Sequence, residues 1–141
     1  MSSAVAATPS GPGEKSVAYP SSVKTEPGTF PYQGGTVARN RGETISVADI
    51  VRLWVTHDRC PDRPETALLP DRDPADGTRV RRSVYGPCAA RTEVALYAIE
   101  GGGHTWPGGP QYLPVAIIGR TSRDIDATRL IWDFFAAHPR S

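Results

Sequence analysis

Val94-Ala95-Leu96-Tyr97-Ala98-Ile99 is the most apolar run of the chain, and it leads directly into Gly101-Gly102-Gly103-His104-Thr105-Trp106-Pro107-Gly108-Gly109. The apolar run is β-branched in part, which is typical of a strand covered on both faces in a parallel sheet. Ligands of open α/β sheets bind beyond the carboxyl ends of such strands, so we expect His104 to lie where chemistry takes place. A tight surface turn with an incidental histidine is the alternative that the spacing leaves open.

The residues around His104 suit a loop that approaches a bound group. The flanking glycines allow sharp turns and close backbone approach, while Trp106-Pro107 supplies an aromatic wall and a rigid exit. The segment that follows, from Pro110 to Gly119, is partly apolar. Two interpretations are open: Trp106 and Tyr112 line a pocket for an acyl or aromatic group, or they and the residues of this segment cap the core.

The motif Gly102-Gly103-His104-Thr105-Trp106-Pro107-Gly108-Gly109 resembles the histidine motif of the polyhydroxybutyrate depolymerase and feruloyl esterase branch of the α/β-hydrolases. The resemblance runs from about Phe30 to Arg140 and includes Asp76-Gly77-Thr78. It also takes in Pro31-Tyr32-Gln33-Gly34-Gly35 and the residues from Asp126 to Phe135.

The resemblance implies a fold of the α/β class, the C-terminal portion of an α/β-hydrolase. We expect a helix, an edge hairpin, a buried strand and a closing helix in residues 30–141, with an incomplete sheet. Residues 1–29 are rich in Ser, Pro, Gly and Ala and are predicted to be irregular or disordered. They do not match the family, so we expect a truncated or frame-shifted start. The uncovered sheet edge predicts self-association.

The resemblance also implies a secreted carboxylic ester hydrolase with a Ser-His-Asp triad, in which His104 is the general base. Glu26 is the carboxylate nearest to the place of the catalytic acid, whereas Asp124 and Asp126 are interpreted as helix-capping groups. The Gly-x-Ser-x-Gly nucleophile motif is absent from the sequence. We therefore expect the chain to be inactive alone. Two alternatives are a non-catalytic module that binds a polymer or aromatic ligand, and a fragment that supplies His104 in trans.

Length and composition restrict the remaining possibilities. The chain has 141 residues and a formal net charge of +1 with both signs interspersed, which favours one modest core and argues against nucleic acid as a partner. It has neither an apolar run of bilayer length nor a signal peptide, so we expect no membrane association, although the family is secreted or periplasmic. The resemblance implies an ester or polyester substrate and neither cofactor nor metal.

Cys60 and Cys88 are the two cysteines of the chain, and they lack metal-ligand spacing. The family resemblance implies that they form a disulfide, and a disulfide implies an oxidising compartment. Two unpaired buried thiols are the alternative.

Local patterns predict the remaining elements. Ser46 with Asp49 forms a capping box, and an apolar stripe predicts a helix over 46–57 that packs on a sheet. Residues 61–74 are predicted to be loop, and residues 79–84 alternate as a short edge strand does. Asp124 or Ser122 is expected to cap a closing helix. Its buried stripe comprises Ala127, Leu130, Ile131, Phe134 and Phe135.

Three polar features near these elements are interpreted as structural. Asp71, Asp73 and Asp76 resemble calcium ligands, but their spacing departs from that of an EF-hand calcium loop. We therefore interpret them as a solvated acidic turn. His57 and His138 are interpreted as helix-end residues that the helix dipole favours.

Overall fold

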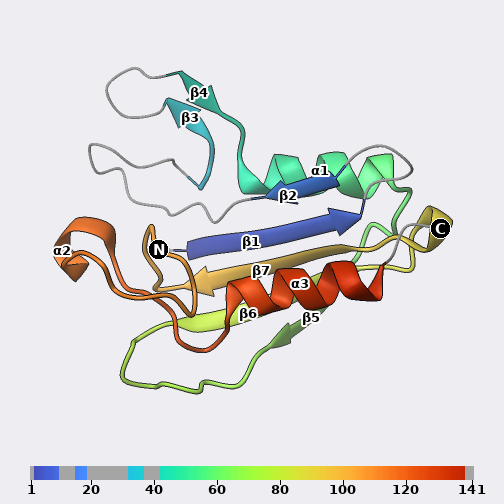
Figure 1. Ribbon diagram of the computed structural model, residues 1–141. Coiled ribbons are helices and arrows are strands. Elements are labelled where there is room, and N and C mark those ends of the chain that lie inside the picture. The colour runs from blue at the N-terminus through green and yellow to red at the C-terminus, as the bar shows by residue number, and fades with distance from the viewer. Residues whose placement is uncertain (1, 10–14, 19–31, 37–41, 139–141) are drawn as a thin grey trace.

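The computed structural model describes residues 2–9, 15–18, 32–36 and 42–138 (Figure 1). Its main sheet has five strands in the order β2-β1-β7-β6-β5. These strands are β1 (Ser2–Pro9), β2 (Lys15–Ala18), β5 (Glu65–Leu68), β6 (Arg79–Tyr85) and β7 (Val94–Glu100), and a small second sheet pairs β3 (Gly35–Thr36) with β4 (Glu43–Thr44). The helices are α1 (Val47–His57), α2 (Val115–Ile118) and α3 (Ala127–Ala137), with a 3₁₀ turn η1 (Ala89–Arg91).

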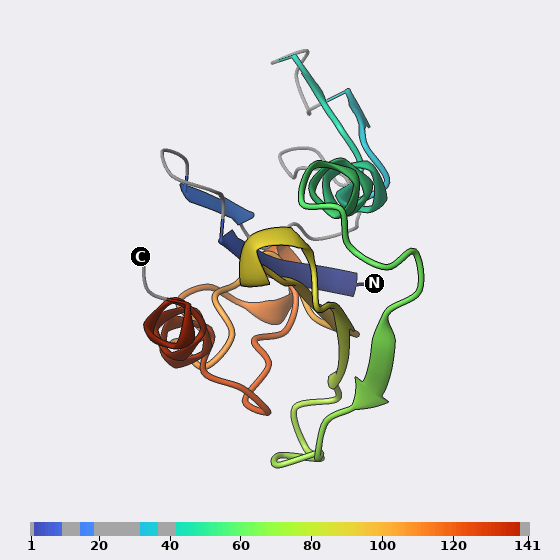
Figure 2. The ribbon, with the colours of Figure 1, turned by 90° about the vertical axis from the view of Figure 1, so that its right-hand side faces the viewer.

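Helices cover both faces of the main sheet. Figure 2 shows α1 and α3 on opposite sides of the strands. Side chains of β7 alternate between two cores, as the two-residue period of a strand requires. Val94 packs against α1, whereas Ile99 packs with Val80 and Ile125 beneath α3. The mixed α/β class and the coverage of β7 on both faces are therefore confirmed.

The direction of strand pairing differs from the expectation. β7 is antiparallel to both of its neighbours, β1 and β6, so the predicted parallel sheet is wrong for the described strands. The reason is that a continuous apolar run reports burial on both faces and carries no information on the direction of the adjacent chains.

The strand at the edge of the sheet also differs from the one expected. β6 was expected at the edge, but it pairs with β7 on one side and with β5 on the other. β5 lies within residues 61–74, which were predicted to be loop, and all four of its residues are exposed. A short, solvent-facing strand flanked by prolines lacks the apolar alternation that would reveal it. Whether this edge mediates self-association stays a prediction.

Residues 1–29 were predicted to be irregular. β1 and β2 lie within this segment, so its described part contains regular structure. The proposed division of the chain between residues 29 and 30 stays a prediction.

The two long helices form close to where they were expected. α1 begins after Ser46, whose Oγ accepts from the Asp49 backbone N at 3.0 Å and donates to the Asp49 carboxylate at 2.7 Å, which confirms Ser46 as the N-cap and its pairing with Asp49. α3 begins after Asp126, whose carboxylate accepts from Arg129 N at 2.9 Å, so the capping role of Asp126 is confirmed and that of Asp124 or Ser122 is wrong. In the expected buried stripe of α3, Ala127 is fully buried and the other four residues are half-buried.

A disulfide joins Cys60 to Cys88 and confirms the predicted pairing. It ties the residues that follow α1 to the turn that precedes β7. No helix in the described ranges combines the length and the apolar character needed to cross a bilayer.

Removing this disulfide is expected to lower the free energy of unfolding by about 3–4 kcal/mol, because the unfolded chain regains the entropy of a closed loop with a sequence separation of 28. Urea unfolding of the Cys60→Ser, Cys88→Ser double variant measures the loss. The wild-type chain unfolded by urea in the presence of reductant is the control, and its free energy of unfolding should match that of the double variant. An unchanged unfolding midpoint would contradict the prediction.

Candidate functional site

β7 leads directly into the loop that carries His104. The strand ends at Glu100, opposite Arg79 at the start of β6, and Gly102 forms a parallel bridge with Arg120. The His104 side chain is half-buried. The expected place of the histidine, beyond the end of a strand covered on both faces, therefore agrees with the structure, whereas its role as a base stays a prediction.

Glycine at position 103 is required by close packing. A Cβ at Gly103 would overlap the carbonyl oxygen of Ile118 and the backbone of Gly119. Gly119 itself has φ +77°, and a Cβ there would overlap the backbone of Gly103. The two glycines let the main chain of the histidine loop lie directly against residues 118–120.

Main-chain hydrogen bonds hold the loop from both ends. Gly103 N donates to Arg120 O at 2.8 Å, and His104 N donates to Ile118 O at 2.6 Å. Further along, Gly108 N donates to the carbonyl oxygen of Ser122 at 2.8 Å. The Thr105 hydroxyl also donates to Arg120 O at 3.1 Å. The backbone position of His104 is therefore determined by the segment 118–122.

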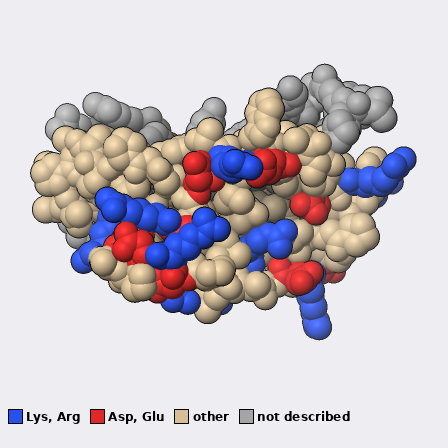
Figure 3. Space-filling model, turned by 60° about the horizontal axis from the view of Figure 1, so that its bottom comes forward, with Lys and Arg blue, Asp and Glu red and all other residues tan. Residues whose placement is uncertain are grey.

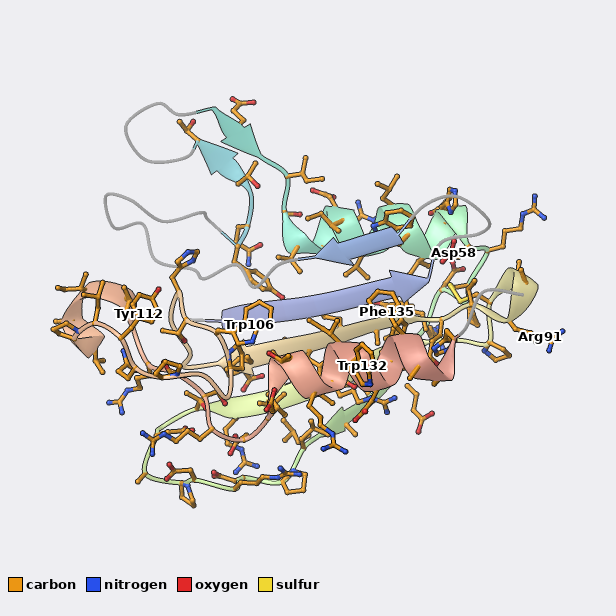
Figure 4. The ribbon with its side chains drawn as sticks, in the orientation of Figure 1. Asp58, Arg91, Trp106, Tyr112, Trp132 and Phe135 are labelled. Atoms are coloured by element: carbon orange, nitrogen blue, oxygen red, sulfur yellow. A yellow bond between two sulfur atoms is a disulfide. The ribbon has the colours of Figure 1, made fainter. Side chains whose placement is uncertain are left out.

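Trp106 and Tyr112, the expected pocket residues, have different partners. The indole Nε1 of Trp106 donates to the Thr128 hydroxyl at 2.9 Å, which ties the loop to α3. The Tyr112 side chain is 59% exposed, and its hydroxyl donates to the carbonyl oxygen of His104 at 3.3 Å. In Figure 4, Tyr112 lies beside α2 and Trp106 lies near the beginning of α3. Their role in substrate binding stays a prediction.

The two other histidines lie at helix ends, as expected. His57 ends α1, and its Nδ1 lies 2.8 Å from the buried carboxylate of Asp58. His138 follows α3, with its Nδ1 2.8 Å from the carbonyl oxygen of Phe134. Figure 4 shows Asp58 at the end of the sheet away from Tyr112, so His57 lies far from the histidine loop. Glu26, the candidate catalytic acid, lies outside the described residues.

A buried polar cluster next to the histidine loop was missed by sequence reasoning. Asp124 is only 2% exposed, and its Oδ1 accepts from the backbone N–H groups of Arg72 at 2.7 Å and Asp73 at 3.3 Å. Close by in the chain, the Ser122 hydroxyl bonds to that of Thr78 at 2.8 Å. Asp124 therefore anchors the acidic turn instead of capping α3. No local pattern links Asp124 to Arg72 and Asp73, because they lie more than fifty residues away in the chain.

The acidic turn is more tightly held than a solvated turn. Asp71 pairs with Arg79 at 2.6 Å, and Asp73 lies 3.6 Å from Arg123. The third carboxylate, Asp76, accepts from the backbone N–H groups of Thr78 and Arg123, both at 2.7 Å. Figure 3 shows blue and red side chains intermingled over this face of the molecule. Within the described ranges, no group of three or more His, Cys, Asp or Glu residues has the arrangement of a metal site.

Asp76 makes the stability of this turn depend on pH. Burial raises the pKa of its carboxyl group, but hydrogen bonds from Arg123 and Thr78 and the Arg123 charge together lower the pKa below its ordinary value. A depressed pKa in the folded state means that the ionised form stabilises the fold. This contribution is complete above the unfolded pKa of 3.8 and is lost as the pH falls through the lower folded pKa.

We therefore expect Asp76→Asn to destabilise the chain at pH 7, and the difference from wild type to shrink as the pH falls below about 4. Urea unfolding at a series of pH values measures this difference. Asp62→Asn is the matched control, because Asp62 is exposed and its substitution should leave the profile of wild type unchanged. A difference for Asp76→Asn that stays constant down to the lowest pH would contradict the assignment.

The chain shows distant, partial similarity to a protein of Nocardia uniformis subsp. tsuyamanensis that bears the name "Putative esterase NocK". The two are 29% identical over 91 residues, which are 64% of this chain and 26% of NocK. The matched part is thus about a quarter of the length of that relative. No protein-family model matches this chain, and no solved structure matches it. The similarity supports a relation to esterases and nothing narrower.

Proposed function

We propose that this chain is the histidine-bearing part of a carboxylic ester hydrolase of the α/β-hydrolase type, with His104 as the general base of a Ser-His-Asp triad. The observation that supports this most strongly is the position of His104. It follows β7 directly, in a loop whose main chain is held by Ile118 and Arg120. A base must be held in a fixed place to accept a proton from a nucleophile within hydrogen-bond reach.

The chemistry assigned to His104 requires groups that this chain lacks. In ester hydrolysis the imidazole takes the proton of the attacking serine and later passes it to the leaving alcohol. The sequence has no Gly-x-Ser-x-Gly motif, so the serine and the oxyanion hole would come from another segment. We expect the 141-residue chain alone to show no enzymatic turnover of esters. A secreted enzyme would suit the Cys60–Cys88 disulfide.

A chimera tests this proposal. The matching part of NocK is replaced by this chain, and the chimera keeps the rest of NocK, in which a nucleophile would lie. Intact NocK is first shown to hydrolyse p-nitrophenyl butyrate, and circular dichroism establishes that the chimera is folded. The proposal predicts turnover by the chimera that depends on His104. A folded chimera that is inactive, or one whose turnover survives His104→Ala, would contradict it.

Exposed apolar side chains near the loop favour a second candidate function, a non-catalytic module that binds a polymer or an aromatic ligand. Tyr112 and Leu113 are 59% and 43% exposed, and Val115 and Ile117 of α2 are 48% and 62% exposed. Such a patch is common at binding surfaces. Co-sedimentation with an insoluble polyester, without ester turnover by the chimera, would favour this candidate. Loss of co-sedimentation in Tyr112→Ser would assign the binding to this patch.

A further inference from the structure

The side-chain amide of Gln111 bonds to three backbone groups of the segment that follows it. Its Nε2 donates to the carbonyl oxygens of Leu113 at 2.8 Å and Gly119 at 2.9 Å. Its Oε1 accepts from the backbone N of Thr121 at 2.9 Å. Both N–H groups and the oxygen of one amide are therefore used to close residues 111–121 into a loop around α2. We call this segment the α2 loop.

The returning part of the α2 loop carries the acceptors that hold the histidine. Ile118 O accepts from His104 N at 2.6 Å, and Arg120 O accepts from Gly103 N at 2.8 Å. Gly119 and Thr121, the residues that Gln111 holds, alternate with these two along the chain. Fixing Gly119 and Thr121 therefore fixes the carbonyl groups on either side of Gly119, and through them the main chain of His104.

We propose that Gln111 is a positioning residue for His104. Its amide neither gains nor loses a proton in the neutral range, so it holds the α2 loop in place and does not act as a base. We call its three hydrogen bonds to Leu113, Gly119 and Thr121 the brace. The Tyr112 hydroxyl, at 3.3 Å from His104 O and on an exposed side chain, is the weaker of the two supports. The catalytic meaning of this brace rests on the proposed function, whereas the brace itself is measurable without any esterase activity.

Amide hydrogen exchange in the isolated chain, followed by nuclear magnetic resonance, tests the brace. In Gln111→Ala we expect the protection of the His104 and Gly103 amides to fall about tenfold, with the protection of β7 amides unchanged. The ring ¹H–¹³C signal of His104 should shift while that of His57 stays. Gln33→Ala is the matched control, because it removes an exposed glutamine from the turn before β3 and should change neither signal.

Gln111→Glu separates a specific brace from general stability. The ionised carboxylate keeps an acceptor for Thr121 N but would face the carbonyl oxygens of Leu113 and Gly119 without a donor. Once protonated, below about pH 4.3, it regains one donor. We expect the protection factor of His104, corrected for intrinsic exchange, to be low at pH 7 and to recover in part near pH 4. General acid destabilisation would change it in the opposite direction.

The proposal is overturned if the His104 amide keeps its protection in Gln111→Ala. It is equally overturned if all amides lose protection together in both variants, because Gln111 would then support the fold as a whole. If the His104 amide loses protection in Gln111→Ala but the chimera is inactive, this inference is supported and the esterase proposal is contradicted. The two failures are therefore distinguishable.

Discussion

Replacing His104 by alanine is expected to reduce ester turnover by the NocK chimera about a million-fold, the scale seen when a hydrolase loses the base of its triad. The imidazole is the group that removes the proton of the attacking serine, and the two other histidines of the chain lie at the ends of α1 and α3. The loss should appear in kcat, because the loop and the substrate surface remain in place. Hydrolysis of p-nitrophenyl butyrate under saturating conditions measures it.

The controls for this result are the two other histidines. His57 and His138 lie at the ends of α1 and α3, so their alanine variants should retain turnover within about threefold of the parent chimera. Circular dichroism and the melting temperature of the His104→Ala chimera should match those of the parent. A comparable loss in His57→Ala would show that the assay reports folding and not proton transfer.

Replacing Gly103 by alanine is expected to destabilise the chain by about 3 kcal/mol or more, or to displace the histidine loop altogether. The added Cβ would overlap Ile118 O and the Gly119 backbone, and neither can move aside as a flexible side chain would. The hydrogen bonds from Gly103 and His104 to residues 118 and 120 would break with that displacement. Urea unfolding gives the free energy, and amide exchange of His104 shows whether the loop has moved.

Gly109→Ala is the matched control from the same loop. A Cβ there would lie 3.0 Å from Trp106 O and 3.5 Å from the Trp106 Cβ, and the substitution needs only a small adjustment. We expect it to cost about 1 kcal/mol or less. Equal destabilisation by the two substitutions would indicate that Gly103 matters for flexibility and not for the contact with Ile118 and Gly119.

Local signals in the sequence predicted the elements whose stability is local. α1 combines an N-cap at Ser46, which pairs with Asp49, with a stripe that includes the buried Val47 and Val51, and both signals lie within a few turns of chain. β7 was predicted because an unbroken apolar run has few explanations other than burial on both faces. The position of His104 after β7 then followed from chain order alone.

The errors concern interactions between distant segments. The direction of the neighbours of β7 is decided by topology, which an apolar run does not encode. Asp124, Ser122 and Asp126 are all chemically suitable caps for α3, and the choice depends on Asp124 bonding to Arg72 and Asp73 more than fifty residues away in the chain. Gln111 was missed because an amide that bonds to backbone groups leaves no residue pattern to recognise.

The covalent link at Cys60 and Cys88 and the histidine loop lie at opposite ends of β7. The loop is held by main-chain hydrogen bonds and contains no sulfur. Material produced in a reducing host cytoplasm should therefore lose shelf life and resistance to proteases while keeping its imidazole in place. Periplasmic production or oxidative refolding would allow the disulfide to form and would restore shelf life and protease resistance.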